Sequence, residues 1–156
     1  MAIEKVKEYF KKYGMEDRVI EFDSSSATVE LAARVLNCRE KDIVKSMAFM
    51  TSDGPIVLEM AGDARIDNSK YKKEFQCKAK MIKQDELVSQ IGHPMGGVCP
   101  FAVNDNVKVY LDESLKQLDR LYPAAGTPNS AVKLNLEELE KYTNYEKWVN
   151  VTKESQ

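Results

Sequence analysis

The stretch Ile43-Val-Lys-Ser-Met-Ala-Phe-Met-Thr-Ser-Asp-Gly-Pro-Ile-Val-Leu-Glu-Met60 decides the fold of this 156-residue chain. It consists of two apolar runs, residues 43–51 and 56–60, on either side of a turn at residues 52–55. An Asp-Gly pair between two apolar runs is a strong signal for a β-hairpin. The segment therefore predicts two antiparallel strands joined by a tight turn. Further short strands are expected at residues 18–22, 79–82, 107–111, 119–123 and 131–134 and around Trp148.

Helices are indicated by capping residues and by apolar side chains at helical spacing. They are expected over residues 3–13 ended by Gly14, 29–37 capped by Thr28, 68–75 capped by Asp67, 85–91 opened by Asp85 and 136–142 capped by Asn135. The expected strands outnumber these helices and do not alternate strictly with them. This order favours an α+β fold around a mixed or antiparallel sheet, one form of which is a closed barrel.

Size and composition predict one domain over residues 1–156 of an ordinary globular class, with 43% hydrophobic and 31% charged residues. The formal net charge of −2 gives no global basic footprint, so a nucleic-acid partner would be held by a local patch. No apolar run approaches the roughly 20 residues that span a bilayer. The first residues, Met1 to Lys7, lack the apolar core of a secretory signal. We therefore expect a cytoplasmic protein without a membrane partner.

The three cysteines, Cys38, Cys77 and Cys99, are widely spaced, and the chain has one histidine, His93. This pattern argues against a disulfide framework and against a zinc site, so neither a metal nor a cofactor is expected. Cys99 and His93 lie six residues apart, which allows a thiol nucleophile as an alternative. That alternative is the least favoured, because no third orienting residue stands out and a proline follows the cysteine.

The segment Gly92-His-Pro-Met-Gly-Gly-Val-Cys-Pro-Phe101 holds three glycines and two prolines in ten residues. Glycine lets a ligand approach the backbone closely, and proline stiffens the chain. Exposed N–H groups at Gly96 and Gly97 are suited to hold a carbonyl oxygen or an anion. The alternative is a tight structural turn between two strands.

Lys45 lies beside apolar residues of the first hairpin strand. Such a lysine either extends to solvent at a sheet edge or supplies a point charge for a phosphate or a carboxylate. A basic run over residues 70–80 has the same two interpretations, a solvated face or a contact to a phosphate backbone.

Several segments, taken in order, resemble the YbaK/EbsC family, also called the prolyl-tRNA-synthetase-associated or INS editing domain. The longest match is the glycine loop, residues 92–101. The others are Thr28-Val-Glu-Leu-Ala-Ala33, Asp42-Ile-Val-Lys-Ser-Met-Ala-Phe49, Ala61-Gly-Asp-Ala-Arg-Ile-Asp67, Val109-Tyr-Leu-Asp-Glu-Ser-Leu115 and Ala125-Gly-Thr-Pro-Asn129. Together they cover roughly residues 20 to 140.

The resemblance implies an α+β fold with a mixed, barrel-like β-sheet and surrounding helices. It also implies hydrolysis of the ester in mischarged aminoacyl-tRNA, commonly tRNA for proline carrying alanine, cysteine or another small residue. The implied partners are the acceptor end of aminoacyl-tRNA and, as a further candidate, prolyl-tRNA synthetase. No synthetase accompanies the segment here, so a free-standing, trans-acting editor is expected.

The resemblance also assigns roles to individual residues. Lys45 would contact the substrate near the terminal adenosine and its phosphate, and Gly96, Gly97 and Pro100 would form the loop that holds the aminoacyl carbonyl. The residues expected at the substrate pocket are completed by Phe22, Thr28, Phe101 and Gly126. Since no nucleophilic triad is apparent, the substrate's own ribose hydroxyl, or the thiol of a cysteinyl ester, would assist the cleavage.

Two departures from the family pattern concern the pocket wall. Cys99 stands where the family more often has serine or proline, and Ala124 and Ala125 stand where some members have a serine. The amino-acid preference is therefore not given by the sequence. A non-catalytic protein that binds aminoacyl-tRNA or another nucleotide-bearing ligand in the same pocket remains the second hypothesis.

Overall fold

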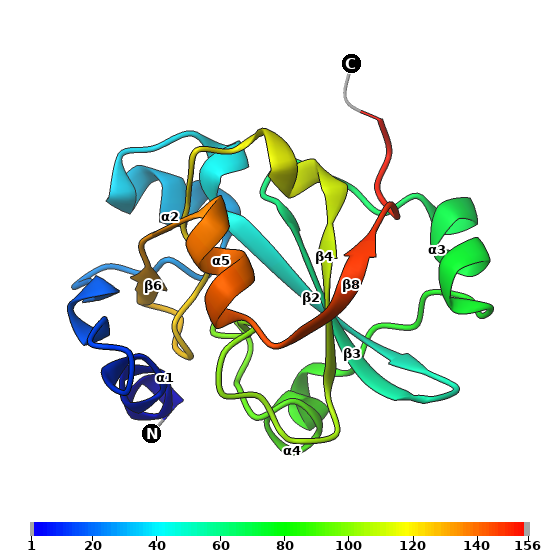
Figure 1. The fold of residues 1–156 in the computed structure, drawn as a ribbon, viewed down its shortest axis with the longest axis horizontal. Coiled ribbons are helices and arrows are strands. Elements are labelled where there is room, and N and C mark those ends of the chain that lie inside the picture. The colour runs from blue at the N-terminus through cyan, green and yellow to red at the C-terminus, as the bar shows by residue number, and fades with distance from the viewer. Residues whose placement is uncertain (1, 155–156) are drawn as a thin grey trace.

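The computed structural model describes residues 2–154 (Figure 1). The α-helices are α1 (Ala2–Lys11), α2 (Val29–Leu36), α3 (Asn68–Phe75), α4 (Leu87–Gln90) and α5 (Leu136–Tyr142). The strands are β1 (Val19–Glu21), β2 (Val44–Thr51), β3 (Gly54–Ala61), β4 (Lys108–Asp112), β5 (Arg120–Leu121), β6 (Ser130–Val132), β7 (Leu134–Asn135) and β8 (Tyr145–Val149). Short 3₁₀ turns are η1 (Glu16–Arg18), η2 (Glu40–Asp42), η3 (Gln84–Glu86) and η4 (Glu113–Gln117).

The central sheet has the strand order β2-β3-β4-β8 and is mixed. β2 and β3 form the expected antiparallel hairpin, whereas β4 is parallel to β3 and β8 is parallel to β4. Two small antiparallel sheets, β1-β6 and β5-β7, lie beside it. The predicted α+β class with a mixed sheet is confirmed.

In the described residues the mixed sheet does not close into a barrel. The outer edge of β2 meets other segments only near its two ends, where Ile43 bridges Tyr122 and Phe49 bridges Met81. Between these two bridges, no described strand pairs with the outer edge of β2. The strands of residues 2–154 therefore form an open sheet with satellite pairs, because no continuous ladder closes it.

Three local predictions need correction. Residues 79–82 form an isolated bridge rather than a strand. The helix expected over 85–91 is divided between η3 and α4. The hairpin turn is centred on Ser52 and Asp53 rather than on Asp-Gly, because Thr51 and Gly54 already pair, with Gly54 at φ +117°. Pro55, which has no N–H, is tolerated within β3 because it and Met50 form a non-hydrogen-bonded pair of the hairpin. The N–H of Met50 points away from β3 and donates to the carbonyl of Lys80.

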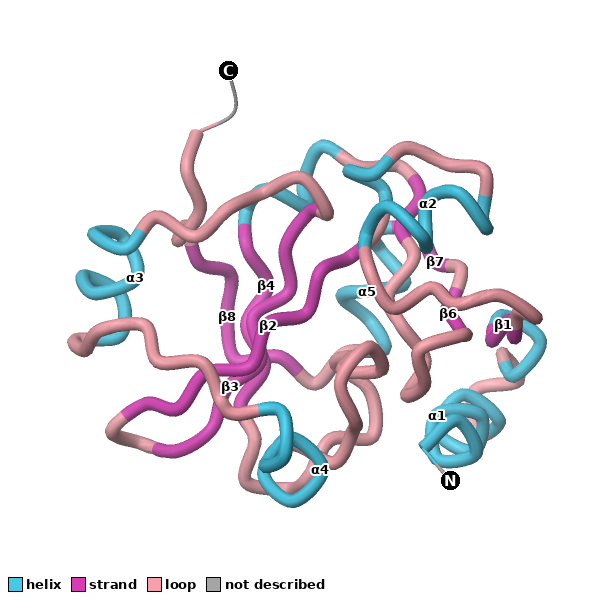
Figure 2. The backbone as a smooth tube through the Cα atoms, turned by 180° about the vertical axis from the view of Figure 1, so that it is seen from behind, coloured by secondary structure: helices cyan, strands magenta, loops and turns pink. Residues whose placement is uncertain are grey.

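The two faces of the β2-β3 hairpin pack into different parts of the core. Ile56, Leu58 and Met60 pack with Tyr71 of α3 on one face. Val57 on the other face packs in a cluster that also contains Ala48, Ile82 and Leu87. Figure 2 shows α3 and α4 at separate sides of the sheet. Residues of β2 with even numbers therefore face the α4 side, and this alternation decides which side chains reach the site.

Asp112, at the end of β4, holds the segment that follows β8 in place through hydrogen bonds. The Asp112 carboxylate is fully buried and accepts hydrogen bonds from the N–H of Ser114 (2.9 Å), the N–H of Val151 (2.9 Å) and the hydroxyl of Thr152 (2.8 Å). A buried carboxylate is stable only when it is hydrogen-bonded in this way. Asp112 thus joins β4, η4 and the C-terminal segment.

We expect Asp112→Ala to lower the free energy of unfolding by about 3 kcal/mol, because it leaves buried donors without an acceptor. Denaturant titration measures this change. The control is Glu113→Ala, which removes an exposed carboxylate next in the chain and is expected to change the free energy by less than about 0.5 kcal/mol. Equal effects of the two substitutions would contradict the role given to Asp112.

Candidate functional site

A cavity of about 340 Å³ lies at the open stretch of the β2 edge. It is lined by residues 43–48 of β2 and its approach, by residues 26–29 before and within α2, by Tyr122 and Ala124, by Met81 and Ile82, and by Met95, Gly96 and Val98. The segments at Tyr122 and Met81 are those that bridge the two ends of β2. The cavity therefore occupies the gap in strand pairing, and its size is in the range of small-molecule sites.

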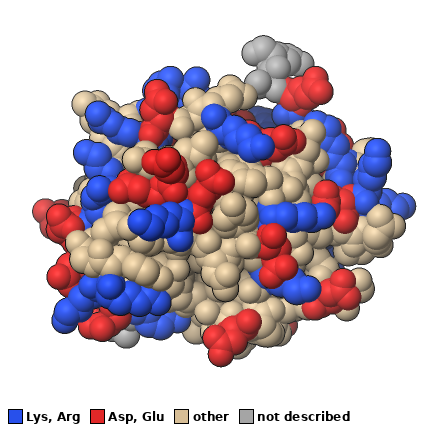
Figure 3. All heavy atoms as spheres, viewed as in Figure 1, with Lys and Arg blue, Asp and Glu red and all other residues tan. Residues whose placement is uncertain are grey.

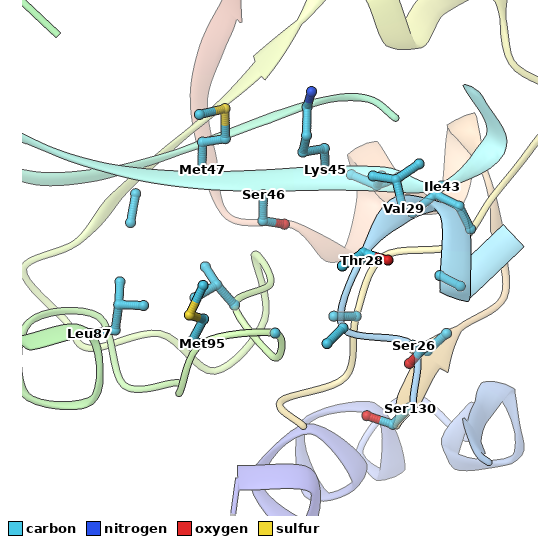
Figure 4. Close-up of a pocket in the computed structure, with 18 of the residues that line it drawn as sticks. Ser26, Thr28, Val29, Ile43, Lys45, Ser46, Met47, Leu87, Met95 and Ser130 are labelled. Carbon is cyan, nitrogen blue, oxygen red and sulfur yellow. The ribbon is translucent and has the colours of Figure 1, made fainter. Parts of the chain in front are cut away.

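Lys45 lies at the rim of this cavity and is half-buried. Figure 4 shows its side chain on the opposite side of the strand from Ser46. Its ammonium group donates a hydrogen bond to the carbonyl of Ala64. Burial lowers the pKa of Lys45, as does the nearby charge of Arg65, whereas Asp63 raises it. The lysine is thus a partly desolvated cation at the mouth, suited to an anionic group that arrives there.

The polar groups inside the cavity are mainly hydroxyls. Ser26, Thr28, Ser46 and Ser130 line it, from three different segments (Figure 4). The Thr28 hydroxyl caps α2 by accepting from the N–H of Leu31 at 3.2 Å, as the sequence predicted. The remaining lining is mostly aliphatic, so a bound ligand would be oriented by a few hydrogen bonds within an apolar enclosure.

The glycine loop, residues 92–101, forms one wall of the cavity through Met95, Gly96 and Val98. Gly97 does not line the cavity but packs against the backbone of Gly126 behind it. The N–H of Gly97 donates to the carbonyl of Pro94 and the N–H of Gly126 donates to the carbonyl of Gly97, both at 3.0 Å. The hydrogen bonds among residues 2–154 include none from the N–H of Gly96.

Helix α1 supports the same loop from outside the cavity. The ammonium group of Lys5 donates to the carbonyl of Gly92 at 2.7 Å. At the other end of the loop, the Phe101 ring lies edge-on to Phe10, with ring centroids 4.7 Å apart. Both ends of the glycine loop are therefore held by one helix.

The structure thus divides the residues expected at the site into two groups. Thr28, Lys45 and Gly96 line the cavity. A second group lies behind the wall and is absent from the described lining; its members are Phe22, Gly97, Pro100, Phe101 and Gly126. Phe22 pairs its backbone with Asn129, and Phe101 is fully buried in the core.

Sequence reasoning missed Ser46, Ser130 and the methionines of the mouth. Met81 and Met95 line the cavity and are 60% and 58% exposed, which is unusual for such large apolar side chains. The alternation that placed Lys45 on one face of β2 was sufficient to place Ser46 on the other. Nothing local to Met81 or Ser130 marks them as site residues.

The thiol of Cys99 is fully buried and does not line the cavity. Its Sγ lies 3.5 Å from Nε2 of His93, and that ring nitrogen lies 2.6 Å from the carbonyl oxygen of Phe101. Burial raises the pKa of the Cys99 thiol well above its usual range and lowers the pKa of His93. Both groups are therefore held neutral at ordinary pH, which opposes a thiolate nucleophile.

The described residues contain no cluster of three or more His, Cys, Asp or Glu side chains that could hold a metal ion. Across residues 2–154, no helix is long and apolar enough to cross a membrane. On the face shown in Figure 3, lysines and arginines are interspersed with aspartates and glutamates. A polyanionic ligand would therefore be held on this face by local contacts rather than by a continuous basic surface.

We expect Gly97→Ala to lower the free energy of unfolding by about 3 kcal/mol, because a Cβ atom there would lie 2.3 Å from the carbonyl carbon of Gly126. Gly14→Ala is the control, since a Cβ atom at Gly14 meets nothing within 4 Å and only its φ of +71° costs about 1 kcal/mol. Thermal or denaturant unfolding compares the two. A smaller effect at Gly97 than at Gly14 would contradict the close approach.

We also expect Cys99 to resist alkylation in the folded protein, because its thiol is buried and protonated. Cys38 and Cys77 are partly exposed and serve as internal controls. Mass spectrometry after iodoacetamide treatment should find label on these two before unfolding and on all three after it. Rapid labelling of Cys99 in the native protein would restore the thiol hypothesis.

Three comparisons with known proteins bear on this site. The family model described as "Aminoacyl-tRNA editing domain" matches residues 23–142. The uncharacterized protein YwhH of Bacillus subtilis is 40% identical over 155 residues, which cover 99% of each chain. The proline–tRNA ligase of Kosmotoga olearia is 29% identical over 92 residues, which are 58% of this chain and only 16% of the ligase.

A solved structure supports the same fold. It is provisionally assigned as a trans-editing enzyme for prolyl tRNA synthetase and superposes with a TM-score of 0.87 at 24% identity, covering 98% of both chains. At that identity the likeness concerns the fold alone. The family match spans the cavity walls from α2 to α5. On the family match and the relative of nearly equal length, this chain belongs to the aminoacyl-tRNA editing domain family.

Proposed function

We propose that this protein hydrolyses the ester of mischarged aminoacyl-tRNA, acting in trans on tRNA for proline that carries a small amino acid such as alanine or cysteine. The observation that carries the proposal is the cavity of about 340 Å³ in the gap of the β2 edge. It is apolar enough for a small side chain, and it has hydroxyl groups inside and a lysine at the rim. The matches to proline–tRNA ligases support the choice of tRNA.

The proposed mechanism relies on positioning of the substrate. The described lining of the cavity contains no cysteine, histidine, aspartate or glutamate. A hydroxyl of the terminal ribose, or the thiol of a cysteinyl group, would therefore assist the attack of water on the ester. Correct orientation alone supplies a large part of the rate enhancement in such reactions.

In this proposal Lys45 meets the phosphate near the terminal adenosine, and Gly96 and Gly97 shape the wall beside the aminoacyl carbonyl. Thr28 borders the substrate directly. Phe22, Pro100, Phe101 and Gly126 act indirectly, by supporting the walls from behind. The acceptor end of tRNA is the only part that must be held, which fits the interspersed charges of Figure 3.

Action apart from a synthetase is supported by YwhH, which this chain covers over 99% of its length. That relative is thus itself a chain of this size, whereas the proline–tRNA ligases carry the matching segment as 16% of a longer protein. Prolyl-tRNA synthetase is the proposed functional partner, because the editor would act on its product.

A second candidate is a protein that binds aminoacyl-tRNA without cleaving it. The absence of histidine, cysteine, aspartate and glutamate from the described lining favours this candidate. Release of the amino acid separates the two.

We expect the protein to release alanine or cysteine, but not proline, from tRNA for proline charged with each in turn. Lys45→Ala should lower kcat/KM by about 100-fold by misplacing the acceptor end. Lys11→Ala, which removes an exposed lysine at the end of α1, is the matched control and should leave the rate unchanged. Release at the enzyme-free rate from every charged tRNA, with binding retained, would favour the second candidate.

A further inference from the structure

Ser46 of β2 and Glu59 of β3 face each other directly across the hairpin. The N–H of Val44 donates outward to the carbonyl of Tyr122 (3.1 Å), and the N–H of Met50 donates outward to the carbonyl of Lys80 (2.9 Å). Even-numbered residues of β2 therefore occupy non-hydrogen-bonded pairs, in which opposite side chains approach most closely. The Ser46 hydroxyl accordingly makes a short hydrogen bond with Oε1 of Glu59.

The same alternation turns the N–H of Ser46 toward the outer edge of β2. This is the stretch between the two bridges, where the cavity lies. Among residues 2–154 no hydrogen bond outside the sheet ladder uses this N–H. Ser46 can therefore offer the cavity a backbone donor and a side-chain hydroxyl from a single residue.

The Glu59 carboxyl is fully buried, and its Oε2 atom has no hydrogen-bond partner in the described structure. Burial raises the pKa of Glu59 to about 8, and the hydrogen bond to Ser46 opposes this rise only in part. The carboxyl is therefore mostly protonated at neutral pH and ionised above pH 8. An unpartnered buried carboxyl is costly, so a structural role alone gives no reason for it.

None of the described groups that face Glu59 carries a charge that would counteract the effect of burial on its pKa. β4 presents Leu111 in register, and the glycine loop presents the Cys99 thiol, whose pKa is raised by burial and also by Glu59. His93, next to Cys99, is kept neutral by burial. Lys45 of β2 points to the other side of the strand and donates to Ala64.

η4 also packs against β3. Its buried side chain is Leu115, and the Ser114 hydroxyl accepts from the N–H of Ala61. Its charged residues, Glu113 and Lys116, are about half exposed and pair with each other at 3.7 Å. Among the described elements, none of these groups supplies a counter-ion for the Glu59 carboxylate.

The position of the Glu59 proton decides what Ser46 presents to the cavity. When Glu59 is protonated, its Oε1–H donates to the Ser46 oxygen, and the Ser46 O–H is free to donate to a ligand. When Glu59 is ionised, it accepts the Ser46 O–H, and only lone pairs of Ser46 face the ligand. Glu59 thus acts on the cavity through Ser46.

We propose that Ser46 is a catalytic residue whose N–H and O–H both donate to the carbonyl oxygen of the aminoacyl ester, and that protonated Glu59 is the positioning residue that aims the O–H. The proposal rests on the deacylation proposed above. Among the described residues, it adds two donors from β2 to the unbonded N–H of Gly96, since the N–H of Gly97 is already bonded to Pro94.

The step balances without an added reagent. The oxygen of water bonds to the carbonyl carbon, and the π electrons of the carbonyl move to its oxygen, which the two Ser46 donors stabilise. The bond to the ribose oxygen then breaks, and that oxygen takes the proton lost by water. Ser46 and Glu59 keep their own protons throughout.

The test compares Ser46→Ala, Ser46→Thr and Glu59→Gln with wild type in deacylation from pH 6 to 9. Ser46→Ala should lower kcat about 100-fold, as loss of one such donor does elsewhere, and Ser46→Thr should restore most of it. Glu59→Gln should keep the activity at pH 7, because its amide N–H donates to Ser46 as the protonated carboxyl does. Circular dichroism at each pH checks that the variants are folded.

The pH profile carries the decisive comparison. With a Glu59 pKa of about 8, the protonated fraction falls about tenfold between pH 7 and pH 9. The ratio of wild-type to Glu59→Gln activity should fall by that factor. Spontaneous hydrolysis is subtracted from each rate, and titration of the substrate amine then cancels in this ratio. A constant ratio, or a Ser46→Ala variant within twofold of wild type, would overturn the proposal.

A second readout does not depend on turnover. 3′-Alanylamino-3′-deoxyadenosine, an amide that is not cleaved, keeps the carbonyl oxygen that Ser46 would contact. At pH 7, calorimetry should find that Ser46→Ala binds this amide more weakly than wild type does. Between pH 7 and pH 9, the affinity of wild type should fall, whereas that of Glu59→Gln should fall less. If wild type binds the amide in this way but cleaves no ester, the deacylase proposal fails and the Ser46 contact stands. Binding insensitive to both residues rejects the contact even where deacylation is observed.

Discussion

The open stretch of the β2 edge is the constraint on which the site depends. A strand edge in a folded protein is usually paired, covered or blocked by charge, because its N–H and C=O groups seek partners. Here the edge is paired at Ile43 and at Phe49, and a cavity occupies the space between. The sheet thus provides a ligand site with rigid walls and with backbone groups already turned toward the ligand. The same interruption explains why the described strands do not close into a barrel.

The sequence predicted best those features that are encoded by neighbouring residues. Thr28, Asp67 and Asn135 each cap a helix as expected, because a capping side chain bonds to a backbone N–H two or three residues away. The β2-β3 hairpin follows from the alternation of its strands and the turn between them. Residues 79–82 were misjudged because their partner, Phe49, is distant in the sequence and bonds them at one bridge only.

The site was predicted in part, for the same reason. Thr28, Lys45 and Gly96 reach the cavity, whereas Phe22 and Phe101, which the family resemblance placed at the pocket, are turned into the packing behind it. Ser130 reaches the cavity from a strand far along the chain, which no local pattern reveals. Whether a residue near a binding loop forms the surface or the support of that loop depends on tertiary packing. In this chain the glycine loop owes its shape to such support, with Gly97 pressed against Gly126.

Helix α1 lies outside residues 23–142, which match the family model, and yet it holds both ends of the glycine loop through Lys5 and Phe10. The wall of the site is therefore braced by a part of the chain that the shared family pattern does not include. Substitutions along α1 would reshape the wall without altering any residue that lines the cavity. Amino-acid preference within this family could thus diverge between relatives whose cavity residues are identical, and an alignment restricted to the shared segment would give no sign of it.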